Sequence, residues 1–238
     1  MSGRRPLLGC AVRGERVRLR DGSVVLIRQV QSRDAPLLAD GFARLSSESR
    51  QLRFLRGKAN LTPAELRYLT AIDHHHHEAL GALNPVDGRG LGVARYIRDA
   101  EDPEGAEVAV TVIDDWQRRG LGIELLQRLV DRARQEGIRH FTALVSDDNA
   151  GVAALLQGNR IGVRVIHGES GAVEYQITLP PRGLGDELHA LLRALGGRQL
   201  RAPAPIRDTL AVLTPEAFSG IPEGSTGDST GPVPEPCS

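Results

Sequence analysis

The stretch EVAVTVIDDWQRRGLGI, residues 107–123, constrains the fold more than any other part of the chain. Its first half is rich in β-branched residues and predicts a strand. A short polar turn separates this strand from an amphipathic segment that predicts a helix. Two glycines, Gly120 and Gly122, lie where that helix begins. Glycine weakens a helix, so two of them in the first turn indicate that another group comes close to the backbone there.

The start of a helix after a glycine turn is a natural binding site for an anion. The first N–H groups have no partner inside the helix, and the helix dipole adds about half a positive charge at that end. Arg118 and Arg119 precede the glycines and offer charge-assisted hydrogen bonds. The pattern predicts a phosphate at residues 118–122. The alternative is a glycine turn that only allows the strand and the helix to pack closely.

Two common phosphate motifs do not fit this stretch. The P-loop spacing GxxxxGK[ST] is absent, and the dinucleotide fingerprint requires a third glycine where this chain has Leu125. Gly- and Pro-containing turns separate the strand-like segments 78–84, 91–99 and 107–114, which favours an antiparallel meander. The interpretation left for this phosphate site is a pyrophosphate bound at a helix start beside an antiparallel meander.

The other segments complete an α/β pattern. Further strands are expected at 23–30, 140–146, 163–167 and 172–179, and helices at 32–45, 46–55, 62–72, 120–137, from 147 to about 160, and 184–197. The 120–137 helix has one apolar stripe, formed by Gly122, Leu125, Leu126, Leu129, Val130 and Ala133. The expected organisation is an irregular basic arm at 1–22, one domain at 23–181, an additional helix at 182–200, and a disordered Pro/Gly/Ser-rich tail at 201–238.

Charge and cysteine content narrow the function classes. Thirty basic residues balance thirty acidic ones, which predicts no nucleic-acid partner and no anionic membrane surface as a partner. Cys10 and Cys237 lie at opposite ends and form no CxxC pair, which favours a reducing cytoplasm over a disulfide framework. No apolar stretch approaches the roughly 18 residues that a membrane helix needs.

The glycine turn carries a resemblance to a known family. Q117-R118-R119-G120-L121-G122 resembles the Q/R-x-x-G-x-G/A signature of the GNAT acetyltransferase superfamily, whose members hold the acetyl-CoA pyrophosphate on that loop. RDGSVVLIRQV, FARLSSESRQLRF and IDHHHHEAL before LGVARYIRD are similar to the acetyltransferase domain of bacterial Pat-type protein lysine acetyltransferases. The resemblance covers about residues 23–180. It implies the GNAT fold, a mixed, mostly antiparallel sheet of about six to seven strands with helices on both faces.

The resemblance also implies a site. Acetyl-CoA would be the co-substrate, without a metal, and its binding residues would be Val110, Thr111, Val112, Arg118, Arg119, Gly120, Leu121, Gly122, Ile123 and Asn149. The strand that contains Val110–Val112 splays from its neighbour in the family and takes the thioester into the gap. Glu107 matches the general base of Pat-type enzymes, and a solvated glutamate at a strand start is the alternative. Asn149 has a second interpretation as a helix cap.

Two features depart from the family pattern or stand outside it. Many members have a tyrosine as general acid where this chain has Leu156 or, counted back from Gly162, Gly158. The thiol of CoA, with a pKa near 8.5, can leave without that help.

The run His74–His77 has no accompanying Cys, Asp or Glu cluster at ligand spacing. Turn structure, a role on the acceptor side and metal binding all stay open for it.

The sequence thus predicts a cytoplasmic acetyl-CoA-dependent N-acetyltransferase that transfers acetyl directly to a primary amine. Protein lysine is the acceptor that the Pat-type resemblance favours. The alternatives are transfer to a small-molecule amine and an acyl-CoA-binding regulatory module without catalysis.

Overall fold

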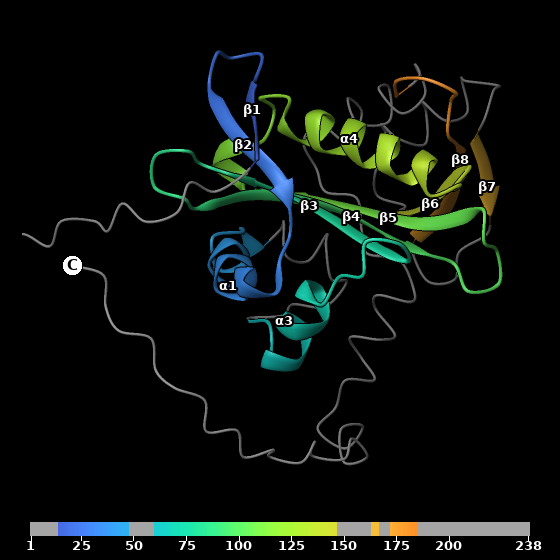
Figure 1. Ribbon diagram of the computed structural model, residues 1–238, viewed down its shortest axis with the longest axis horizontal. Coiled ribbons are helices and arrows are strands. Elements are labelled where there is room, and N and C mark those ends of the chain that lie inside the picture. The colour runs from blue at the N-terminus through green and yellow to red at the C-terminus, as the bar shows by residue number, and fades with distance from the viewer. Residues whose placement is uncertain (1–13, 48–59, 147–162, 167–171, 185–238) are drawn as a thin grey trace, which may run out of the picture.

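The computed structural model describes residues 14–47, 60–146, 163–166 and 172–184 (Figure 1). They form one eight-stranded sheet with the strand order β1-β2-β3-β4-β5-β6-β8-β7. The strands are β1 (Glu15–Arg18), β2 (Val24–Gln29), β3 (His77–Leu83), β4 (Gly90–Arg98), β5 (Gly105–Val112), β6 (His140–Ser146), β7 (Val163–Ile166) and β8 (Ala172–Thr178). Neighbouring strands are antiparallel, except that β5 and β6 are parallel.

Helices cover both faces of this sheet (Figure 1). Helix α4 (Leu121–Gln135) lies across one face, and α1 (Ala35–Ala43) and α3 (Pro63–Thr70) lie on the other. The short 3₁₀ helices η1 (Ser32–Asp34) and η2 (Asp114–Trp116) precede α1 and α4. The expected mixed, mostly antiparallel sheet with helices on both faces is confirmed, with eight strands rather than six or seven.

The central strands are the ones with continuous apolar runs. Every residue of β5 except Thr111 is buried, because helices cover both faces of this part of the sheet. Alternation along the strand places Val108, Val110 and Val112 under α4. Glu107 and Thr111 therefore face the side of α1 and α3. This two-sided burial explains why β5 lacks the polar alternation of a strand with one face in water.

Helix α4 is the element that the sequence predicts best. Its expected apolar stripe is buried at every position with a side chain: Leu125, Leu126, Leu129, Val130 and Ala133. The sixth member of the stripe, Gly122, lies over Val110 and Val112 of β5. The helix ends at Gln135, just before Gly137, whose φ of 81° is in the left-handed region that glycine tolerates.

Helix α3 begins with the predicted capping box. The Thr62 hydroxyl accepts a hydrogen bond from the Glu65 N–H at 3.3 Å, and the Glu65 carboxylate accepts one from the Thr62 N–H at 2.7 Å. Pro63 occupies the first helical position, where its missing N–H costs nothing. This reciprocal capping fixes the start of a helix that has only eight residues.

The sheet begins earlier in the chain than the sequence interpretation had it. Strand β1 lies inside the 1–22 segment and pairs antiparallel with β2, so an irregular arm is wrong for Glu15–Arg18. Val17 and Leu19 are buried, while Arg16 and Arg18 are exposed. The basic composition of this segment obscures the two-residue alternation that is typical of a strand.

Several expectations fall outside the described residues. They are most of the 46–55 helix, the helix from 147 to about 160 with Asn149, the 184–197 helix beyond Leu184, and the tail at 201–238. The limits of the 23–181 domain and of the 182–200 helix therefore stay predictions.

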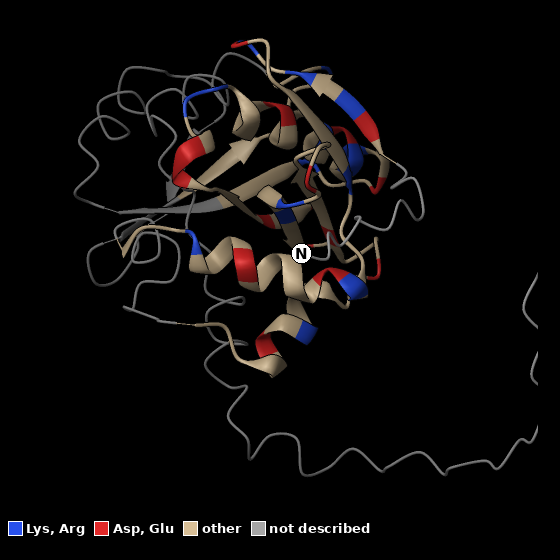
Figure 2. Cartoon of the chain, turned by 90° about the vertical axis from the view of Figure 1, so that its left-hand side faces the viewer, with Lys and Arg blue, Asp and Glu red and all other residues tan. Residues whose placement is uncertain are grey.

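The described part of the chain agrees with the balanced composition. Basic and acidic residues are interspersed over its helices and strands (Figure 2). None of its helices is long and apolar enough to cross a membrane.

Candidate active site

The parallel pairing of β5 with β6 stops partway along both strands. Three residue pairs connect them, and the last joins Glu107 to Thr142. Beyond that pair β5 continues to Val112 and β6 continues to Ser146, with no further registered pairs between these described residues. The two strands thus part at Glu107, and the diverging portion of β5 contains Val110–Val112.

The start of α4 follows this diverging portion. Gly120 is the cap residue, and its φ of 92° is left-handed. The first hydrogen bond within the helix runs from the Glu124 N–H to the Gly120 carbonyl at 3.1 Å. Because glycine has no side chain, no side-chain cap accepts hydrogen bonds from the N–H groups at the start of the helix. Such N–H groups and the helix dipole form the type of site that binds an anion.

The two glycines have different physical reasons. Gly120 has a backbone conformation that other residues adopt only with strain. Gly122 has no such requirement, and a Cβ atom there would meet Val110 and Val112 at 3.8 Å, which is ordinary van der Waals contact. Contacts among the described residues therefore do not require glycine at position 122. Close packing does not require glycine at position 120 either, because the nearest atom to a Cβ there, in the Arg20 side chain, would lie 3.5 Å away.

Three arginines gather at this helix end. Arg118 has a left-handed φ of 61°. The Arg119 guanidinium stacks over the Trp116 ring at 4.9 Å and lies 3.3 Å from the Asp21 carboxylate. The third is Arg20, whose side chain comes within 3.5 Å of a Cβ built at Gly120. Sequence reasoning missed Arg20 because it assigned the β1–β2 hairpin to an irregular arm.

Glu107 occupies the point where β5 and β6 part. It is 8% exposed and lies across from Ile97 of β4 and Thr142 of β6. Thr111, four residues further along the same face of β5, lines a cavity between the sheet and α1. The structure therefore brings Glu107, the Val110–Val112 segment and the start of α4 along one path at the end of β5. Asn149 lies outside the described residues.

The histidine run forms a turn that one carboxylate holds in place. The Asp73 carboxylate accepts hydrogen bonds from three consecutive backbone N–H groups, those of His75, His76 and His77, at 2.8–2.9 Å. Burial raises the pKa of Asp73, but these hydrogen bonds outweigh burial and lower the pKa to about 2. The carboxylate therefore stays ionised and fixes the turn.

The rings of the run diverge from this turn. His74 lies 2.9 Å from the Glu78 carboxylate, and His75 lies 3.0 Å from Glu136. The His77 ring is buried, 3.1 Å from the Arg95 guanidinium. Within the described residues, no group of three His, Cys, Asp or Glu side chains is placed to hold a metal ion. The observed contacts are those of ordinary turn structure.

Comparison with known proteins agrees with this geometry. The acetyltransferase (GNAT) family model matches residues 46–159. The acetyltransferase PA5475 of Pseudomonas aeruginosa is 37% identical over 133 residues, which cover 55% of this chain and 71% of that protein. The chain belongs to the GNAT acetyltransferase family. The described domain is thus of the acetyl-CoA-dependent N-acetyltransferase class.

Two further relatives place the chain within the GNAT family. The acetyltransferase Pat of Mycolicibacterium smegmatis is 32% identical over 169 residues, which cover 69% of this chain and 49% of that protein. The solved GNAT domain of S. lividans PAT superposes with a TM-score of 0.61 at 28% identity, covering 70% of this chain and 97% of that domain. The chain spans about half the length of the mycobacterial Pat. The similarity to Pat-type GNAT domains is confirmed.

Proposed function

We propose that this chain transfers the acetyl group of acetyl-CoA directly to a primary amine. The observation that carries the proposal is the parting of β5 from β6 shortly before a helix whose cap residue has no side chain. The diphosphate would accept hydrogen bonds from the N–H groups of Gly120, Leu121, Gly122 and Ile123. Arg118 and Arg119 would add charge-assisted bonds.

The pantetheine arm would follow the same path toward Glu107. It would lie along Val110, Thr111 and Val112 as an added strand, bound through backbone groups. Asn149 would contribute a further contact, as the family resemblance implies. This arrangement would bring the thioester to the point where the two strands part, beside Glu107.

Glu107 would act as the general base. A lysine-type amine has a pKa near 10.4, so about one molecule in 10³ is neutral at pH 7. Glu107 would take the proton, and the neutral nitrogen would attack the thioester carbon. A backbone N–H near Val110–Val112 would stabilise the resulting oxyanion. The C–S bond would then break, and the CoA thiolate would leave and take up the second proton that the nitrogen loses, without a tyrosine acid.

Two acceptors have separate support. Protein lysine is supported by the similarity to proteins named Pat. A small-molecule amine is supported by the cavity beside Thr111, because a concave apolar cavity suits a small ligand better than a protein surface. Incubation of the protein with radiolabelled acetyl-CoA and cell lysate separates the two, since label enters either proteins on a gel or the small-molecule fraction. Binding of acetyl-CoA without label transfer into either fraction would favour the non-catalytic module.

A further inference from the structure

Arg95 of β4 is a charged residue in the interior. It is 1% exposed, and it extends from the face of the sheet that α1 and α3 cover. Burial lowers the pKa of Arg95 from 12.5 to about 10, so the guanidinium keeps its charge at neutral pH. A buried charge needs compensation, because its removal from water costs several kcal/mol.

Within the described part of the chain, neutral groups supply the hydrogen-bond contacts to this charge. The Arg95 Nη1 group donates to the carbonyl of Leu69 at 3.2 Å and lies 3.1 Å from His77 Nε2. Burial, and then the charge of Arg95, lower the pKa of His77 to about 3, so this imidazole is neutral at physiological pH. Arg95 Nε has no hydrogen-bond partner, and no described carboxylate lies within ion-pair distance of the guanidinium. The described residues thus leave one buried positive charge without an anion at ion-pair distance.

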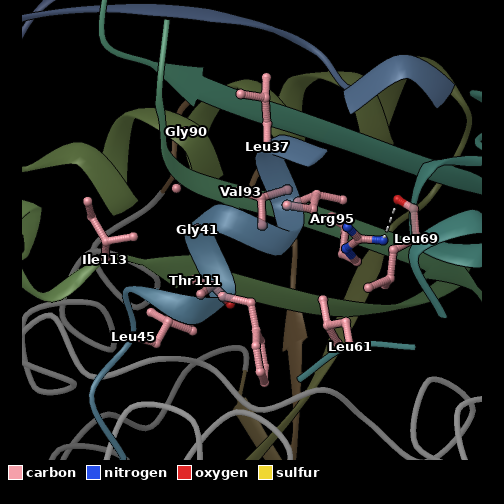
Figure 3. A pocket seen from close by; sticks show the side chains of 13 residues that line it. Leu37, Gly41, Leu45, Leu61, Leu69, Gly90, Val93, Arg95, Thr111 and Ile113 are labelled. Atoms are coloured by element: carbon pink, nitrogen blue, oxygen red, sulfur yellow. Dashed lines mark hydrogen bonds between the residues drawn. The ribbon is translucent and has the colours of Figure 1, made fainter. Parts of the chain in front are cut away.

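Arg95 lines a cavity of about 80 Å³ between the sheet and the helices α1 and α3 (Figure 3). The other side chains around the cavity are mainly apolar and include Leu37, Phe42, Leu45 and Leu61. Of the thirteen lining residues, all within the described part of the chain, Arg95 alone is charged. Its guanidinium lies at the α3 end, beside Leu69 (Figure 3). A ligand that fits this cavity has an apolar body and one anionic group.

The cavity is close to the proposed reaction centre. Arg95 lies directly across from Ala109 of β5. Glu107 and Thr111 are the next residues of β5 on the same face, one to each side of Ala109. Residues on such diagonal positions of neighbouring strands are about 7–8 Å apart. A small molecule that reaches Arg95 with one group can therefore present another group near Glu107.

We propose that this cavity is the acceptor subsite and that Arg95 binds the carboxylate of a free amino acid with an apolar side chain, whose amine is acetylated. The inference rests on the proposed acetyl transfer and deepens its small-molecule form. The amine nitrogen gives one proton to Glu107 and forms a bond to the acetyl carbon, after which the C–S bond breaks and the thiolate takes up the second proton of the nitrogen. The products are an N-acetyl amino acid and CoA. The carboxylate takes no part in the bond changes and serves only to position the acceptor.

The test compares leucine, methionine and phenylalanine with their carboxamides, which keep the amine and the side chain but lack the carboxylate charge. Rates are normalised to the concentration of unprotonated amine, because the amine pKa differs between acid and amide. The wild-type protein should prefer the acid by about tenfold or more in kcat/KM, as expected for a hydrogen bond to a charged group. Arg95→Met should remove that preference, whereas Arg89→Met, in the exposed β3–β4 loop, should keep it.

A binding measurement keeps the proposal testable if Arg95→Met does not fold. Arg95 also ties the end of α3 to the sheet, so the melting temperature and the acetyl-CoA affinity of the variant are recorded first. In the wild-type protein saturated with CoA, 4-methylpentanoate, which is leucine without its amine, should bind in calorimetry and compete with leucine. The neutral 4-methylpentanamide should bind at least about tenfold more weakly.

Three results would overturn the assignment. One is equal use of acids and amides, together with equal binding of 4-methylpentanoate and its amide. Another is a preference of the wild type for succinyl-CoA over acetyl-CoA that Arg95→Met abolishes, which would place the carboxylate on the donor. The third is a preference for acids that survives in a folded Arg95→Met. If neither lysate nor any amine is acetylated, the proposed function fails, and the binding of 4-methylpentanoate still decides the subsite.

Discussion

Replacement of Glu107 by glutamine tests the proposed chemistry with little disturbance of the fold. Glutamine has nearly the same volume, so it suits a position that is 8% exposed and lies where β5 and β6 part. It cannot take a proton from the incoming ammonium group. We expect kcat/KM at pH 7 to fall by roughly 10²–10⁴-fold, the usual contribution of a general base. The affinity for acetyl-CoA, measured by calorimetry, should stay within about twofold, because the proposed cofactor contacts lie elsewhere.

The pH dependence of kcat/KM is a second test of Glu107 as the general base. Below a pKa near 10.4, the neutral fraction of a lysine-type amine rises about tenfold with each pH unit. Glu107→Gln should therefore recover as the pH rises, with log kcat/KM increasing by about one per pH unit between about pH 7 and pH 9. If kcat/KM of Glu107→Gln is about 100-fold below that of the wild type at pH 7, this difference should nearly disappear at about pH 9. Release of the CoA thiol, followed with a chromogenic disulfide, measures both proteins.

The control is Glu104→Gln, three residues earlier in the chain. The Glu104 side chain is 64% exposed and pairs with Arg139 at 3.2 Å, so its neutralisation should change neither rate nor stability noticeably. A wild-type rate of Glu107→Gln at pH 7 would show that Glu107 is not the general base. An equal loss of kcat/KM at pH 7 and pH 9, together with lower stability, would show instead that Glu107 is a structural residue.

Two further predictions concern stability. Gly120→Ala should lower the free energy of unfolding by about 1–2 kcal/mol, because the φ of Gly120 is 92°. Gly122→Ala should raise the free energy of unfolding by about 0.5–1 kcal/mol, because the new Cβ would lie 3.8 Å from its nearest neighbours. Urea unfolding that gave the reverse order would contradict these reasons. Burial and the charge of Arg95 lower the pKa of His77 in the folded protein from 6.5 to about 3. As the pH falls below 6.5, the unfolded chain therefore binds the proton before the folded protein does. The free energy of unfolding should then fall by at most about 1.4 kcal/mol per pH unit. His77→Gln should flatten this dependence between about pH 6.5 and pH 4.5, and an unchanged slope would show that His77 is not the group responsible.

The sequence predicted those elements whose pattern is local. Helix α4 combines a 3.6-residue apolar stripe with glycines at both ends, and β5 is a continuous apolar run, so both were predicted within two residues of their limits. Strand β1 was missed because Val17 and Leu19 are the only apolar residues of the segment 15–20, which also contains three arginines. At the edge of a sheet, that composition resembles a basic arm unless the two-residue alternation is given priority.

The part of the site that the sequence could not predict depends on long-range packing. Arg95 occurs in a strand-like segment, and nothing local indicates that α3 and the turn at residues 73–77 bury it. The Asp73 carboxylate fixes that turn through its hydrogen bond from the His77 N–H, and the His77 ring is buried. The pairing of β3 with β4 then brings this ring within 3.1 Å of the Arg95 guanidinium.

The glycine turn was predicted from the sequence only in part. The sequence predicted a helix start close to a strand end, and the structure has that arrangement at Gly120 and Val112. It did not predict that Arg20, from a hairpin far earlier in the chain, reaches the same place. A hairpin that folds over a distant helix start leaves no periodic signal in the residues of either segment.

The most direct measurement is a crystal structure of the protein with acetyl-CoA bound. We expect diphosphate oxygens within about 2.7–3.2 Å of backbone nitrogen atoms of residues 120–123, with the thioester between the parted β5 and β6 and near Glu107. A diphosphate bound elsewhere, with those backbone nitrogens facing water or protein instead, would contradict this expectation.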